Sequence, residues 1–109
     1  MLLLTFLFAD EGKVIEVEGE VLDLACYIHE GARGEGHKKC AEMCIKGGAP
    51  IGVITSDGKL YLIVEDHNNP KPYEEIKNYA AQIVKVKGTL YNRNGLQGIV
   101  ISSVQPSKK

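Results

Sequence analysis

The distribution of apolar and polar positions along the chain predicts five β-strands. Over Lys13–Asp23, valine and isoleucine alternate with glutamate, which is the period of a half-buried strand. Gly19 interrupts this strand and indicates a bend, which would let one long strand serve both sides of a small barrel. Two apolar segments, residues 51–65 and 83–104, each contain an Asp-Gly or Asn-Gly pair near their centre and are therefore predicted to form β-hairpins.

Two helices are predicted between these strands. The first covers residues 37–46, follows a connector with three glycines, and ends at a Gly-Gly pair with Pro50 just beyond it. The second is short and covers about residues 73–81. The resulting order is that of an OB-fold: a mainly β, five-stranded barrel with one helix inserted after strand 1 and one between strands 3 and 4. Another small β-barrel or an α+β roll is the alternative topology.

The chain length of 109 residues corresponds to one domain, assigned to residues 11–105, with residues 106–109 as a polar tail. The apolar run at residues 2–9 is far shorter than the roughly 20 residues needed to cross a bilayer, so no transmembrane span is predicted. We interpret residues 1–10 as the remnant of an export signal with Ala9 at a cleavage position, or as an N-terminal arm that packs on the barrel. Export would place the protein in the periplasm or outside the cell, where disulfides form.

Composition and charge exclude several classes of protein. With 44% hydrophobic and 25% charged residues, the chain is neither disordered nor fibrous. Thirteen basic and fourteen acidic residues give a formal net charge of -1, so there is no excess of positive charge to neutralise phosphates and no nucleic-acid partner is expected. No nucleophile with a paired base can be recognised, which favours a binding protein over an enzyme.

Cysteine and histidine are concentrated in one short segment. The candidate ligands there are all three cysteines and two of the three histidines: Cys26, His29, His37, Cys40 and Cys44. Thiolate and imidazole groups bind zinc, copper and iron, so this segment predicts a transition-metal site whose ion is not specified by the spacing.

Helix geometry decides which of these residues can share an ion. Cys40 and Cys44 lie about 6 Å apart along a helix axis and roughly 40° apart around it, so both can point at one ion. His37 is about 10 Å along the axis from Cys44 and can join them only from a looser turn before the helix. We expect Cys26 to contribute a further ligand from the end of the first strand.

The same cysteines allow two other interpretations. A disulfide from Cys26 to Cys40 or Cys44 would tie the helix to the barrel and leave one spare thiol. The protein would then be a non-catalytic binding or scaffold domain for a peptide, protein or oligosaccharide. A thiol oxidoreductase that cycles a disulfide between Cys26 and Cys44 is the third interpretation.

Five short motifs together resemble small exported bacterial OB-like domains of uncharacterised function. They are G-E-V-L-D-L-A-C from Gly19, H-K-K-C-A-E-M-C from His37, G-G-A-P from Gly47, D-G-K-L-Y from Asp57 and V-K-V-K-G from Val84. The resemblance covers about residues 19–104, and the sequence departs from the pattern in its abbreviated N-terminus. It implies a secreted or periplasmic OB-like domain and brings no particular activity with it.

Overall fold

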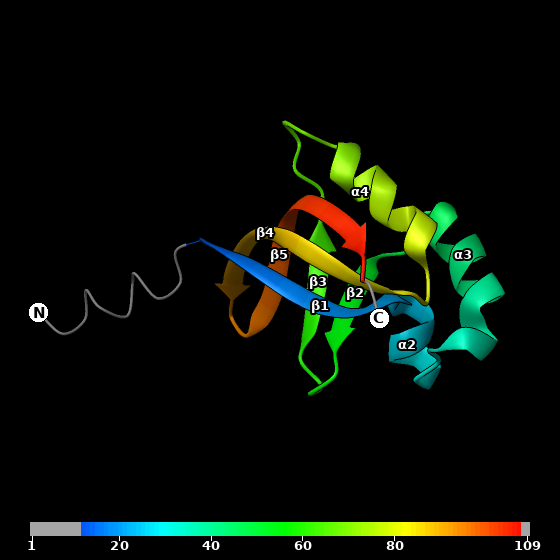
Figure 1. The fold of residues 1–109 in the computed structure, drawn as a ribbon. Helices are drawn as coiled ribbons and strands as arrows, with labels where there is room; N and C mark the ends of the chain where they lie inside the picture. The colour runs from blue at the N-terminus through cyan, green and yellow to red at the C-terminus, as the bar shows by residue number, and fades with distance from the viewer. Residues whose placement is uncertain (1–11, 108–109) are drawn as a thin grey trace, which may run out of the picture.

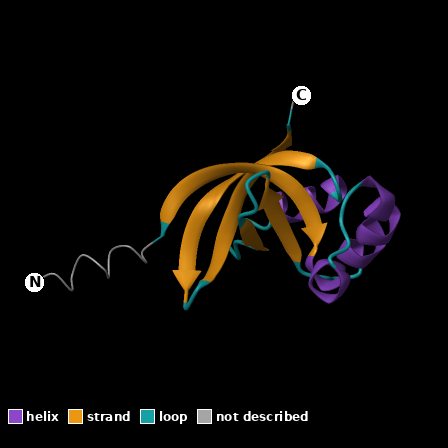
Figure 2. Cartoon of the chain, turned by 90° about the horizontal axis from the view of Figure 1, so that it is seen from below, coloured by secondary structure: helices purple, strands orange, loops and turns teal. Residues whose placement is uncertain are grey.

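Five strands close into a barrel in the computed structural model, which describes residues 12–107, and the helices gather at one end of that barrel (Figure 1, Figure 2). The interpretation of residues 1–10 lies outside the described residues. The elements in chain order are β1 (Lys13–Asp23), α2 (Leu24–Glu30), the 3-10 turn η1 (Glu35–His37), α3 (Lys38–Lys46), β2 (Ile51–Thr55), β3 (Leu60–Val64), α4 (Lys71–Ile76), the 3-10 turn η2 (Lys77–Tyr79), β4 (Ile83–Arg93) and β5 (Leu96–Pro106). Within residues 12–107, no helix is long and apolar enough to cross a membrane.

The strand order around the barrel is β1-β2-β3-β5-β4, and β4 pairs back to β1. All neighbouring strands are antiparallel except β3 and β5, which are parallel. The first part of β1 pairs with β4 and its last part pairs with β2, and the change of partner falls at Gly19. A Cβ at Gly19 would overlap the backbone carbonyl of Ile54, so the absent side chain lets the two strands approach. The prediction that one long strand serves both sides of the barrel, with the change of neighbour near Gly19, is therefore confirmed.

The core fills the barrel interior and the layer beneath the helices. In β4, for example, Val84 and Val86 are buried while Lys85 and Lys87 between them are exposed, as expected for a strand with one face inward. Ala41 and Ile45, one turn apart on α3, are both buried and seat that helix on the barrel.

The prediction of a mainly β, five-stranded barrel is confirmed, as is the helix between the third and fourth strands. The prediction of a single helix after the first strand is wrong, because α2 precedes α3 in that connection. Asp23 begins α2 by capping it, and Gly31 ends it in the left-handed conformation with φ 70°. Cys26 and His29 accordingly lie on a helix and not at the end of a strand or in a loop.

Candidate metal centre

Helices α2 and α3 bring the three cysteines together. Cys26 lies in the first turn of α2, and Cys40 and Cys44 lie one turn apart on α3. Because Ala41 and Ile45 face the barrel, the adjacent row that holds the two cysteines lies beside the buried face. The three Sγ atoms are within 4.8 Å of one another, and all three cysteines are free thiols in the structure. The predicted meeting of Cys26, Cys40 and Cys44 is therefore present.

Asp23 connects the end of β1 to the start of α2. Its Oδ1 accepts hydrogen bonds from the backbone N–H groups of Ala25, at 2.9 Å, and Cys26, at 3.3 Å, which is the geometry of a helix N-cap. The residue is only 1% exposed, and its second oxygen, Oδ2, is buried with no hydrogen-bond partner among the described residues. Burying a carboxylate oxygen without a conventional hydrogen bond is costly, so this atom is available to bind a cation.

His37 supplies the atom opposite this oxygen. It lies in η1, ahead of α3, in the looser turn that the helix geometry required. Its Nε2 is 3.9 Å from Oδ2 of Asp23, too far for a direct hydrogen bond, and is likewise buried with no partner among the described residues. Ligand atoms of Asp23, Cys26 and His37 lie within 4.8 Å of one another. This triad combines an oxygen, a sulfur and a nitrogen donor, a set that suits a divalent transition metal.

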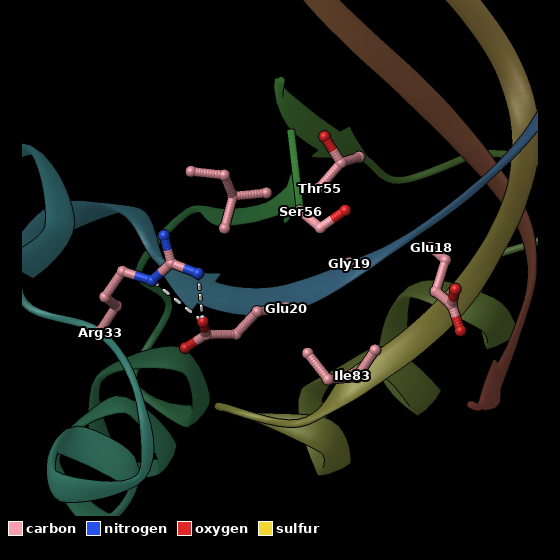
Figure 3. A pocket seen from close by; sticks show the side chains of 8 residues that line it. Glu18, Gly19, Glu20, Arg33, Thr55, Ser56 and Ile83 are labelled. Carbon is pink, nitrogen blue, oxygen red and sulfur yellow. Dashed lines mark hydrogen bonds and ion pairs between the residues drawn. The ribbon is translucent and has the colours of Figure 1, made fainter. Parts of the chain in front are cut away.

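The connection that carries His37 is held to the barrel by an ion pair. Arg33 donates to the carboxylate of Glu20 on β1, which is itself 6% exposed (Figure 3). The same pair lines a cavity of about 340 Å³ between β1, β2 and the start of β4. This cavity is lined by residues other than the candidate ligands. The contribution of the ion pair to the candidate metal centre is indirect: Glu20 also accepts the N–H of Gly34, and so fixes the chain just ahead of His37.

Electrostatics place the protons of the cluster on sulfur. Burial raises the pKa of the Asp23 carboxyl, but hydrogen bonding to the Cys26 and Cys44 thiols and to backbone N–H groups outweighs burial and holds that pKa below its ordinary value. Hydrogen bonding to Asp23, together with burial and the negative charge of Asp23, raises the pKa of Cys26 to about 12. Asp23 is also the main cause of the raised pKa of Cys44. A bound cation would replace these thiol protons, since metals bind the thiolate form.

The five residues predicted as ligands are not all brought together. Cys26, Cys40 and Cys44 meet, and His37 meets Cys26. His29 is exposed in the last turn of α2 and belongs to neither group. Sequence reasoning missed Asp23, which was assigned only as the last residue of a strand. The signal that would have found it is the pair of cap residues of a short helix: an aspartate, which is typical of a helix start, and eight residues later Gly31, which is typical of a helix end.

Comparisons with known proteins add no relative: no family model, no curated protein and no solved structure matches the chain. The geometry of the cluster is therefore the basis for assigning a function.

Proposed function

We propose that the protein is a small metal-binding module that holds a transition-metal ion, with zinc as the first candidate, between Asp23, Cys26 and His37. The observation that carries this proposal is the pair of buried atoms, Asp23 Oδ2 and His37 Nε2, which face each other at 3.9 Å. Neither atom has a conventional hydrogen bond within residues 12–107, and the Cys26 and Cys44 thiols lie close to the same carboxylate. An ion between them, bonded at roughly 2.0–2.2 Å to oxygen and nitrogen, would satisfy both after a small adjustment of the side chains.

The chemistry of the donor set supports zinc over the hard cations. Calcium and magnesium take oxygen ligands almost exclusively, whereas a sulfur and an imidazole nitrogen accompany the single carboxylate here. Three protein ligands leave a fourth position for water or for a ligand supplied from outside. The ion would also join α2, through Cys26, to η1, through His37, and so stabilise the connection between the first two strands.

The test is zinc affinity, measured by competition with a chromophoric chelator on reduced protein. His37→Ala is expected to lower the affinity at least tenfold, about 1.4 kcal/mol. His29→Ala is the matched control, because it removes the same side chain from an exposed position nearby, and it is expected to leave the affinity unchanged. An undetectable affinity in the unmodified protein, or equal losses in the two variants, would refute the proposal.

A disulfide-stabilised binding domain is the second candidate function, favoured by the proximity of the three sulfur atoms. The two candidates differ in their thiol counts. Metal binding predicts three titratable thiols after removal of the ion by a chelator, and fewer before it. The disulfide predicts one titratable thiol that no chelator affects.

We also propose that the barrel is of the OB type and that the protein is exported. The strand order β1-β2-β3-β5-β4 with a parallel β3–β5 pair supports the first assignment. The apolar run at residues 2–9 and the resemblance that begins at Gly19 support the second. Cell fractionation with N-terminal sequencing of the mature protein tests export; a cytoplasmic protein that retains residues 1–9 would contradict it.

A further inference from the structure

We propose that Cys26, Cys40 and Cys44 form a second metal position, which takes copper(I) and shares the Cys26 sulfur with the position at Asp23 and His37. The sharing of Cys26 rests on the proposed function; the copper position itself rests on the three thiols alone. The structure groups the ligand atoms into two triads, each within 4.8 Å, and Cys26 is the residue common to both.

The two positions differ in how deeply they lie. Asp23 is buried and His37 is half-buried, so the first position lies against the barrel. Cys40 is exposed and Cys44 is half-buried, so the second position opens to solvent between α2 and α3. The thiol position is therefore the more accessible of the two to an ion in solution.

The donor atoms also favour different ions. Three thiolates form a soft set, which selects copper(I), an ion that is stable with three sulfur ligands. A carboxylate and an imidazole are harder donors and favour a divalent ion such as zinc. The soft donors and the harder donors are thus separated into the two triads, with one sulfur between them.

Sharing a sulfur couples the two positions. A thiolate that bridges two ions donates less to each, and two cations a few ångströms apart repel each other. Loading with zinc should therefore weaken copper(I) binding, and loading with copper(I) must weaken zinc binding by the same factor, because the coupling is reciprocal.

The experiment measures both affinities in four variants. Copper(I) is titrated anaerobically against bicinchoninate, and zinc against a chromophoric chelator. We expect Cys44→Ser to lower the copper(I) affinity at least tenfold, and Cys40→Ser to do the same while it retains zinc. His37→Ala should do the reverse, and Cys26→Ser should lower both. Cys40 is exposed, so its serine variant is expected to fold, and thermal unfolding of the metal-free variants checks this.

Three outcomes would overturn this inference. Loss of zinc in Cys40→Ser would mean one site that includes Cys40, and unchanged copper(I) affinity in the same variant would mean that no thiol position exists. Zinc and copper(I) affinities that are independent of each other would mean that no sulfur is shared. In each of these cases the proposed function survives if His37→Ala still loses zinc. Conversely, a protein that binds copper(I) through three thiols but binds no zinc would refute the proposed function and leave the copper position.

Discussion

The carboxylate of Glu20 on β1 is held by Arg33, thirteen residues further along the chain, whose Nη2 and Nε donate to Oε1 at 2.7 and 3.0 Å. The other oxygen of Glu20 accepts the N–H of Gly34 at 2.7 Å, and the carbonyl of Gly34 accepts the N–H of His37 at 2.9 Å. A continuous chain of hydrogen bonds therefore runs from the barrel wall to His37 of the candidate metal centre.

Replacing Arg33 should loosen this chain. In Arg33→Ala the buried Glu20 carboxylate keeps the hydrogen bond from the Gly34 N–H and loses both bonds from Arg33. We expect the free energy of unfolding to fall by about 1–3 kcal/mol. The lower end of this range applies because Arg33 is partly exposed to solvent. Zinc affinity should fall as well, because His37 is less well positioned. Urea denaturation and metal titration measure the two effects. Arg93→Ala is the control. Arg93 is exposed, and within residues 12–107 its guanidinium lies over the ring of Tyr91 and forms no ion pair. A similar loss of stability in this variant would contradict a specific role for Arg33.

Two substitutions at Asp23 separate its two roles. Asn caps helices as well as Asp does, so Asp23→Asn should keep the cap of α2 and lose only the contacts of the carboxylate charge, while it lowers zinc affinity at least tenfold. Asp23→Ala removes the cap too and should cost a further 0.5–2 kcal/mol, roughly. Thermal unfolding without metal and zinc titration provide the comparison. If the Asn variant bound zinc like the unmodified protein, Asp23 would be only a capping residue.

The raised pKa of Cys26 predicts how the metal-free protein responds to alkaline pH. Below about pH 9 the thiol is protonated in both the folded and the unfolded chain, and the stabilising contact with Asp23 is fully present. Between pH 9 and about 12 the unfolded chain loses this proton while the folded chain keeps it, so the stability should fall as the pH rises. Unfolding followed by circular dichroism over this range measures the slope, and Cys26→Ser should make the slope shallower. An unchanged slope would show that Asp23 does not hold the proton of this thiol.

The same contact should protect Cys26 from alkylation. With iodoacetamide, the metal-free protein should react slowly at Cys26 at pH 8, because only the thiolate is nucleophilic and its formation is disfavoured next to Asp23. Asp23→Asn should accelerate the reaction at Cys26, which peptide mass spectrometry resolves from reaction at the exposed Cys40. Equal rates at Cys26 in the two proteins would contradict the pKa direction.

Gly19, like Gly88 on β4, should be sensitive to the gain of a side chain, because a Cβ at either position would overlap backbone of the neighbouring strand. In Gly19→Ala the Cβ would overlap the Ile54 carbonyl where β1 changes partner, and we expect a loss of about 1–3 kcal/mol in the free energy of unfolding. Gly36→Ala is the matched control: a Cβ there meets open space, so the change should be neutral or stabilising by up to about 1 kcal/mol. Denaturant unfolding of the pair tests this, and equal effects would mean that the strand changeover tolerates a wider separation.

Local patterns were sufficient for the strands, the hairpins and α3. Alternation over residues 15–18 reports which face of the first strand is turned inward, although residues 19–23 are buried on both faces. The spacing of Cys40 and Cys44 places both on one side of any helix. Helix α2 was missed because its seven residues give too few turns for a periodic signal, and its apolar residues continue those of β1. Only its two cap residues distinguish it from an extension of the strand.

The sequence by itself therefore determined the elements whose pattern repeats over neighbouring residues, and the presence of soft metal ligands between the first two strands. The tertiary structure alone decided that α2 precedes α3, that His29 faces solvent, and that Asp23 meets His37, fourteen residues away, across the start of α2. The reason is physical. Periodicity is a property of adjacent residues, whereas the distance between Asp23 and His37 depends on how α2, the connection pinned by Glu20 and Arg33, and the barrel pack together.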